Sequence, residues 1–83
     1  MPRKKIVEVV REHLSTDLYF AAYCQVAGAP YLRTERDGSR VTFVFDAAKA
    51  GPLVDAWFNR SGTVSAIDYA NSIRNLKNLV YKG

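Results

Sequence analysis

Four polar side chains near the C-terminus recur at the spacing of one helix face. They stand at i, i+3, i+4 and i+7 of a segment with helical periodicity, and they are Asn71, Arg74, Asn75 and Asn78. Asparagine and arginine hydrogen-bond base edges and phosphates, and Lys77 lies beside them. Because asparagine is a poor helix former, stability does not explain three of them on one face. The pattern predicts a nucleic-acid-binding face, and its alternative is a solvated helix face.

A second basic surface is predicted on a β-hairpin at about 31–45. Asp37-Gly38 is a favoured two-residue turn, and this register places Glu35 opposite Arg40. Strand alternation puts one set of side chains on the core face, namely Leu32, Val41, Phe43 and Phe45. The outer face then carries Tyr31, Arg33, Arg40 and Thr42, with Arg36 near the turn. Basic residues beside an aromatic ring suit a nucleic-acid backbone, whereas the alternative is ordinary strand exposure.

Catalytic, metal and cofactor sites find no support in the residue types. His13 is the single histidine, and its neighbours Ser15 and Asp17 belong to a turn, so closeness in sequence does not make a triad. One histidine and one cysteine do not supply a metal ligand set, and Cys24 is typical of a small buried hydrophobe. The scattered glycines match no phosphate-binding loop. We therefore expect a non-enzymatic protein without a cofactor.

The elements that must position these surfaces are four helices and the hairpin. Residues 4–14 are rich in β-branched side chains, which is typical of a strand, but adjacent apolar pairs break the alternation. We predict a helix there, while the choice between helix and strand stays open. Asp17 begins a helix that ends at Ala27 before Gly28 and is apolar almost all round, so we expect it at the centre, with Tyr19, Phe20 and Tyr23 enclosed.

Two further helices follow the hairpin. The first is predicted from about Pro52 to Asn59, with Asp46 able to cap the segment before it. The last covers about 66–81 and is capped by Ser65; its expected core face is Ala66, Tyr69, Ala70, Ile73, Leu76 and Val80. Because a lone hairpin needs its apolar face covered, we predict one α+β domain over 1–83 in the order α-α-β-β-α-α.

Three stretches of the chain resemble a family of short bacterial proteins and domains. They are the Thr16-Asp17-Leu18-Tyr19 helix start, the Phe43-Val44-Phe45 strand and the closing run from Leu76 to Tyr81, Leu-Lys-Asn-Leu-Val-Tyr. The resemblance covers about 15–81. That family has no assigned activity, so the resemblance implies a globular domain and no mechanism.

Composition and charge leave two kinds of partner. A net charge of +4 favours polyanions, although acidic and basic residues are interspersed. Ile67 and Leu79 lie off the core face of the last helix, so the alternative function is protein interaction or homo-oligomerisation. No stretch is long enough to span a bilayer, and the basic start lacks a signal-peptide core, so we expect a cytoplasmic protein without a membrane partner.

Overall fold

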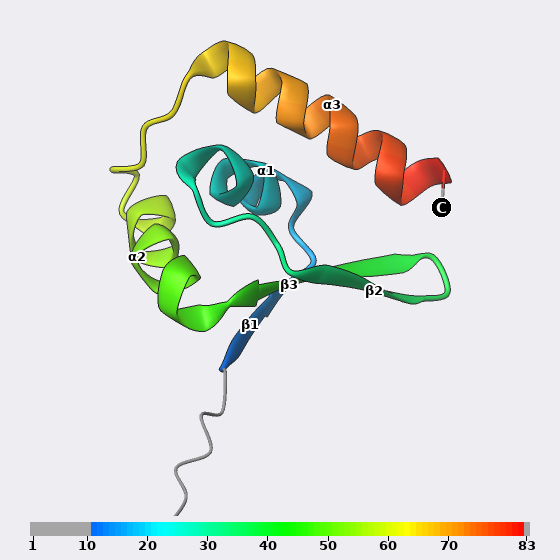
Figure 1. Ribbon diagram of the computed structural model, residues 1–83. Helices are drawn as coiled ribbons and strands as arrows, with labels where there is room; N and C mark the ends of the chain where they lie inside the picture. The colour runs from blue at the N-terminus through cyan, green and yellow to red at the C-terminus, as the bar shows by residue number, and fades with distance from the viewer. Residues whose placement is uncertain (1–10, 83) are drawn as a thin grey trace, which may run out of the picture.

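In the computed structural model, which describes residues 11–82, the elements follow the order β-α-β-β-α-α (Figure 1). They are β1 (Glu12–Ser15), α1 (Leu18–Ala27), β2 (Arg33–Asp37), β3 (Arg40–Asp46), α2 (Ala47–Phe58) and α3 (Ala66–Lys82). The strands form an antiparallel sheet in the order β1-β3-β2. The α+β class is confirmed, and the predicted order is wrong at its first element.

The predicted first helix is replaced by strand β1 over residues 12–15, while residues 4–10 lie outside the described residues. His13 pairs with Phe45 of β3, and its ring packs at 5.8 Å from Phe20 and 6.3 Å from Phe45. Pairing with a strand some thirty residues away is invisible to a local periodicity count. The helical pattern at residues 12–14 was therefore overruled by a nonlocal partner.

Helix α1 lies between the sheet and α3 and forms the centre of the molecule, as predicted (Figure 1). The Asp17 carboxylate caps it by accepting from the amides of Tyr19 at 2.9 Å and Phe20 at 3.2 Å. Gly28 ends it in the left-handed region with φ 103°, where a side chain would be strained. Phe20 and Tyr23 are buried, but Tyr19 is 49% exposed, so the prediction that it is enclosed is wrong.

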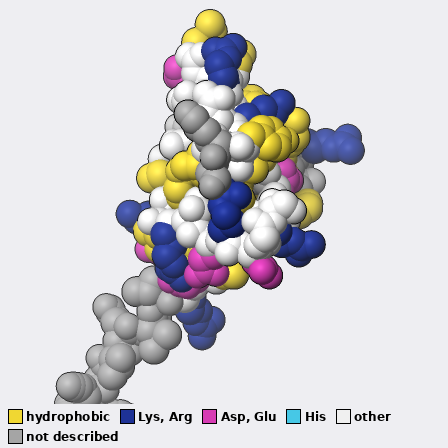
Figure 2. All heavy atoms as spheres, turned by 90° about the vertical axis from the view of Figure 1, so that its right-hand side faces the viewer, with side chains coloured by type: hydrophobic (Ala, Val, Ile, Leu, Met, Phe, Trp, Pro, Cys, Tyr) yellow, Lys and Arg dark blue, Asp and Glu magenta, His cyan; other side chains and the backbone are white. Residues whose placement is uncertain are grey.

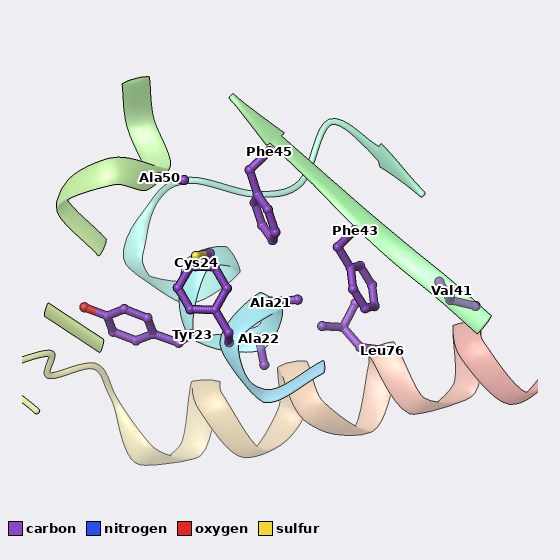
Figure 3. Packing of buried hydrophobic residues seen from close by; sticks show 10 residues of the cluster. Ala21, Ala22, Tyr23, Cys24, Val41, Phe43, Phe45, Ala50 and Leu76 are labelled. Carbon is purple, nitrogen blue, oxygen red and sulfur yellow. The ribbon is translucent and has the colours of Figure 1, made fainter. Parts of the chain in front are cut away.

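The hydrophobic core fills the space between α1, the inner face of β3 and α3 (Figure 3). Phe43 and Phe45 point from β3 toward α1, and Leu76 of α3 meets Phe43 from the other side. Alternation along β3 was thus predicted correctly for its inward residues. The buried members of this core are Phe20, Ala21, Ala22, Tyr23, Cys24, Val41, Phe43, Phe45, Ala50 and Leu76.

The hairpin turn is shifted by one residue from its predicted place. The turn residues are Gly38 and Ser39, and Asp37 pairs with Arg40, which leaves Glu35 opposite Thr42. Gly38 has φ 65°, so glycine takes the first central position, where a two-residue hairpin loop needs positive φ. The pairing therefore moves by two positions, which preserves the alternation of faces in β2 and β3. Arg36, which was predicted with the outer surface, lies opposite Val41 on the inner face.

Just before β2 the predicted faces exchange. Leu32 lies in a bend and is 54% exposed, whereas Tyr31 is half-buried with its ring 5.4 Å from Phe43. Because β2 begins only at Arg33, strand alternation cannot be extended back to these residues. Tyr31 is therefore a core contact and not part of an outer binding face.

Helix α2 begins at Ala47, five residues before the predicted start at Pro52. The Asp46 carboxylate caps it by accepting from the Ala48 amide at 2.9 Å, and Ala50 in the first turns is completely buried. Pro52 lies inside the helix, where it removes one amide from the hydrogen-bond ladder. The cap and the burial of Ala50 hold the first turns in place across this gap.

Helix α3 turns a slightly different face to α1 from the predicted one. Ala66 and Ala70 are exposed, while Ser72 is buried and donates to Gln25 of α1 at 2.7 Å. The buried or half-buried side is Tyr69, Ser72, Ile73, Leu76 and Val80. A side chain–side chain hydrogen bond to α1 thus takes the place of an alanine contact, which hydrophobic patterning alone cannot predict.

Candidate functional site

The outer face of α3 carries all five of its predicted site residues in exposed positions. They are Asn71, Arg74, Asn75, Lys77 and Asn78. Ser65 starts the helix by accepting from the Asp68 amide at 3.3 Å, and Leu76 anchors its other side in the core. Arg74 donates to the Asn71 side chain at 3.2 Å, which orients its guanidinium along the helix. This face is the part of the predicted surface that the fold brings together.

Charge on α3 is acidic only in the first turn. Asp68 lies there, near the positive end of the helix dipole, and the later charged residues are Arg74, Lys77 and Lys82. Asp68 lies three residues before Asn71, at the N-terminal end of the outer face of α3, so this face is basic only beyond the first turn. Such a face attracts anions, although two or three cations make a narrow electrostatic footprint.

Arg33 of the predicted hairpin surface is engaged by carboxylates on both sides. It lies on the outer face of the sheet, 2.8 Å from Glu12 of β1 and 3.0 Å from Glu35 of β2. The hydrogen bond to Glu12, followed by the one to Glu35, raises the pKa of Arg33. The hydrogen bond between Arg33 and Glu12 also lowers the pKa of the Glu12 carboxyl. Its charge is thus neutralised across β3, which leaves little for an external anion.

Arg36 and Arg40 of the hairpin lie in different environments. Arg36 lies on the inner side and donates to the carbonyls of Leu79 at 3.4 Å and Val80 at 3.2 Å, so it caps the last turn of α3. Arg40 is exposed and lines a groove of about 420 Å³ that Tyr81 also lines. The structure therefore does not gather the hairpin arginines with the outer face of α3.

The wider distribution of charge agrees with this separation. On the face shown in Figure 2, Lys and Arg side chains are spread among hydrophobic and acidic ones and do not form one patch. Any anion-binding surface on this face is therefore local, and within the described residues the outer face of α3 is the best-defined one.

An aromatic cleft of about 290 Å³ lies where α1, α2 and the start of α3 meet, and the sequence did not predict it. Tyr23, Trp57 and Tyr69 line it, with the Tyr23 and Trp57 rings 5.5 Å apart. Arg60 and Gly62 complete it from the connection between α2 and α3. Desolvation raises the pKa of the Tyr69 hydroxyl, which donates to the Tyr19 carbonyl at 3.2 Å. We call this the aromatic cleft.

Gly62 is required where the chain passes the Tyr23 ring. A Cβ at position 62 would clash with the Tyr23 hydroxyl and lie only 2.6 Å from its Cζ. Because Tyr23 is a stiff, buried ring, we expect Gly62→Ala to lower the free energy of unfolding by about 2 kcal/mol. Urea denaturation measures this, with the exposed neighbour Ser61→Ala as the control, which should change stability by less than about 0.5 kcal/mol. Equal losses in the two variants would contradict the close approach.

His13, Ser15 and Asp17 line a second cleft, of about 260 Å³. The Ser15 hydroxyl accepts from the Asp17 amide at 3.1 Å, the Asp17 carboxylate caps α1, and the His13 ring packs on Phe20. Among residues 11–82 no hydrogen bond joins the three side chains to one another, so they do not form a proton relay.

No group of three or more His, Cys, Asp or Glu side chains in residues 11–82 is arranged to hold a metal ion. In the same part of the chain, each helix is too short or too polar to cross a bilayer.

Comparison with known proteins gives a family match. Residues 10–82 match the model of a family described as a domain of unknown function, DUF5659. The predicted resemblance to a family without assigned activity is confirmed, and the match begins five residues before the predicted start at 15. No curated protein and no solved structure matches the chain.

Proposed function

Because the chain belongs to the DUF5659 family, whose function is unknown, we propose a function from its own surface: it binds nucleic acid through the outer face of α3. One observation carries this proposal. Asn71, Arg74 and Asn78 are exposed together with Asn75 and Lys77 on one helix, with no acid beyond the first turn. These are the side chains that contact phosphates and base edges.

The contact between Asn71 and Arg74 supports a role in recognition. The 3.2 Å hydrogen bond holds the guanidinium in one direction while its other donors remain for a phosphate or a base. Arg33 and Arg36 are engaged within the fold, so the proposed site excludes them. Arg40 lines a separate groove with Val80 and Tyr81, so the proposed site does not include it either.

Removal of the two exposed cations of α3 tests the proposal. We expect the wild type to bind random DNA or RNA, and Arg74→Ala with Lys77→Ala to lower the slope of log affinity against log salt by about 2. Fluorescence anisotropy of a labelled oligonucleotide at several salt concentrations measures this slope.

Arg33→Ala is a matched control because it also removes one exposed positive charge. Arg33 is already paired with Glu12 and Glu35, so we expect a much smaller loss of affinity than for Arg74→Ala. Equal losses would mean that net charge, and not the outer face of α3, determines binding. Absence of binding at low salt, or affinity indifferent to salt, would reject the proposal.

A second candidate function is self-association or protein binding. Ile67 is 69% exposed and Tyr81 is 80% exposed, and with Asn71, Arg74 and Asn78 they repeat at spacings of four and three along α3. This is the spacing at which a helix packs on a second helix. A dimer in sedimentation analysis, together with no nucleic-acid binding, would favour this candidate.

A further inference from the structure

Arg60 occupies a backbone position that usually belongs to glycine. With a φ of 60°, Arg60 is the single non-glycine residue among residues 11–82 whose backbone lies in the left-handed region. The Arg60 amide donates to the Trp57 carbonyl at 3.3 Å, and the Ser61 amide donates to the Ala56 carbonyl at 2.9 Å. This pair of bonds is the Schellman ending of α2, in which glycine is the favoured residue at position 60. The fold itself therefore gives no reason for an arginine there.

Arg60 is one of the residues that line the aromatic cleft. Trp57, Tyr23 and Tyr69 supply its aromatic walls, and Arg60 is its single charged lining residue within the described part of the chain. In Figure 3 the Tyr23 ring leaves the core cluster, with its hydroxyl outermost, toward the connection between α2 and α3. Tyr23 lines the cleft, although the residue as a whole is only 5% exposed.

Aromatic walls and an arginine with no ion-pair partner among the described residues together define a ligand chemistry. A flat ring stacks on Trp57 or Tyr23, and a planar carboxylate takes two parallel hydrogen bonds from an arginine. Among residues 11–82 no acid lines the cleft, so no described side chain there opposes a negative charge. A volume of about 290 Å³ lies at the lower end of small-molecule sites, which limits the ligand to about one ring.

We propose that the aromatic cleft binds a small planar aromatic carboxylate, with its ring on Trp57 and its carboxylate on Arg60. The strained backbone at Arg60 is then retained for binding and not for stability. Tyr69 enters the cleft from the side of α3 that faces α1, so the site is separate from the outer face of α3. Failure of nucleic-acid binding leaves this proposal unaffected.

Trp57 is the one tryptophan of the chain, so its fluorescence reports the cleft directly. Three probes of similar size separate the contributions at constant ionic strength: benzoate, the non-planar cyclohexanecarboxylate, and the uncharged benzyl alcohol. We expect benzoate to change the Trp57 emission with a dissociation constant of about 1 mM, and the other two to bind at least about fivefold more weakly. No saturable change with benzoate up to about 10 mM would overturn the proposal.

Arg60→Gly separates binding from folding. Glycine is favoured at this backbone position, so we expect the variant to fold with an unchanged or higher midpoint of urea unfolding and to bind benzoate about tenfold more weakly. Arg60→Lys keeps the charge but not the planar fork, and an intermediate affinity is expected. Arg74→Ala, on the opposite side of α3, should leave benzoate binding unchanged. Wild-type affinity in Arg60→Gly, or equal affinity for benzyl alcohol, would refute the role of Arg60.

Discussion

Phe43→Ala is expected to lower the free energy of unfolding by about 3–5 kcal/mol, enough to leave little of the domain folded. Phe43 is 1% exposed on the central strand β3, with α1 on one side, Leu76 of α3 on another and the Tyr31 ring 5.4 Å away (Figure 3). Two helices and the loop before β2 converge on this ring, so no single one can collapse into the space it leaves. Urea denaturation followed by Trp57 fluorescence and circular dichroism measures the loss.

Phe58→Ala is the matched control because the same atoms are removed from a ring that is 77% exposed. Its unfolding free energy should change by less than about 0.5 kcal/mol. A loss of similar size in both variants would mean that ring removal acts through the unfolded state. A small loss in Phe43→Ala alone would contradict the placement of β3 at the centre of the core.

Local chemistry is what the sequence predicts well. The cap residues Asp46 and Ser65 and the helix end at Gly28 were identified correctly, because a cap acts within about three residues of itself. Asp17, predicted as the first residue of its helix, is instead the cap that precedes it. The inward face of β3 was also predicted. A two-position change in pairing preserves the period of two, so the wrong turn residues left Val41, Phe43 and Phe45 inward.

Nonlocal pairing accounts for the errors. Strand β1 forms because its backbone pairs with the free edge of β3. The residue types at 12–15 do not indicate that this edge is available. Continuation of α2 through Pro52 likewise depends on the burial of Ala50 beneath its first turns, where a local reading of Gly51-Pro52 predicts a helix start.

The candidate site residues likewise fall into those that a local pattern predicts and those whose role depends on distant partners. The outer face of α3 follows from helical periodicity alone, so its five residues were predicted together. The roles of Arg33 and Arg36 could not be predicted because their partners are distant in sequence. Glu12 lies 21 residues from Arg33, and Leu79 lies 43 residues from Arg36. The aromatic cleft draws on residues from 23 to 69, and its Tyr and Trp side chains look like ordinary core residues in sequence.

Alkaline pH is expected to unfold the domain through Cys24. The thiol is fully buried in α1 at the centre of the core, and this desolvation raises its pKa from the ordinary 9.0 to about 12. Between these values the unfolded chain has lost the thiol proton and the native chain still holds it. The stabilisation is therefore complete below pH 9.0 and is lost as the pH rises toward about 12, by about 1.4 kcal/mol per pH unit.

Cys24→Ala isolates this effect from the other groups that titrate at high pH. Tyrosines and lysines are the same in both proteins, so their contributions cancel when the two slopes are subtracted. The variant loses some packing at neutral pH, but between pH 9 and 11 its free energy of unfolding should fall less steeply than that of the wild type, by about 1.4 kcal/mol per unit. Parallel curves for the two proteins would show that the thiol ionises without unfolding the core. Cys24 would then have access to solvent, and α1 would not be the enclosed central helix on which the assignment of every binding surface depends.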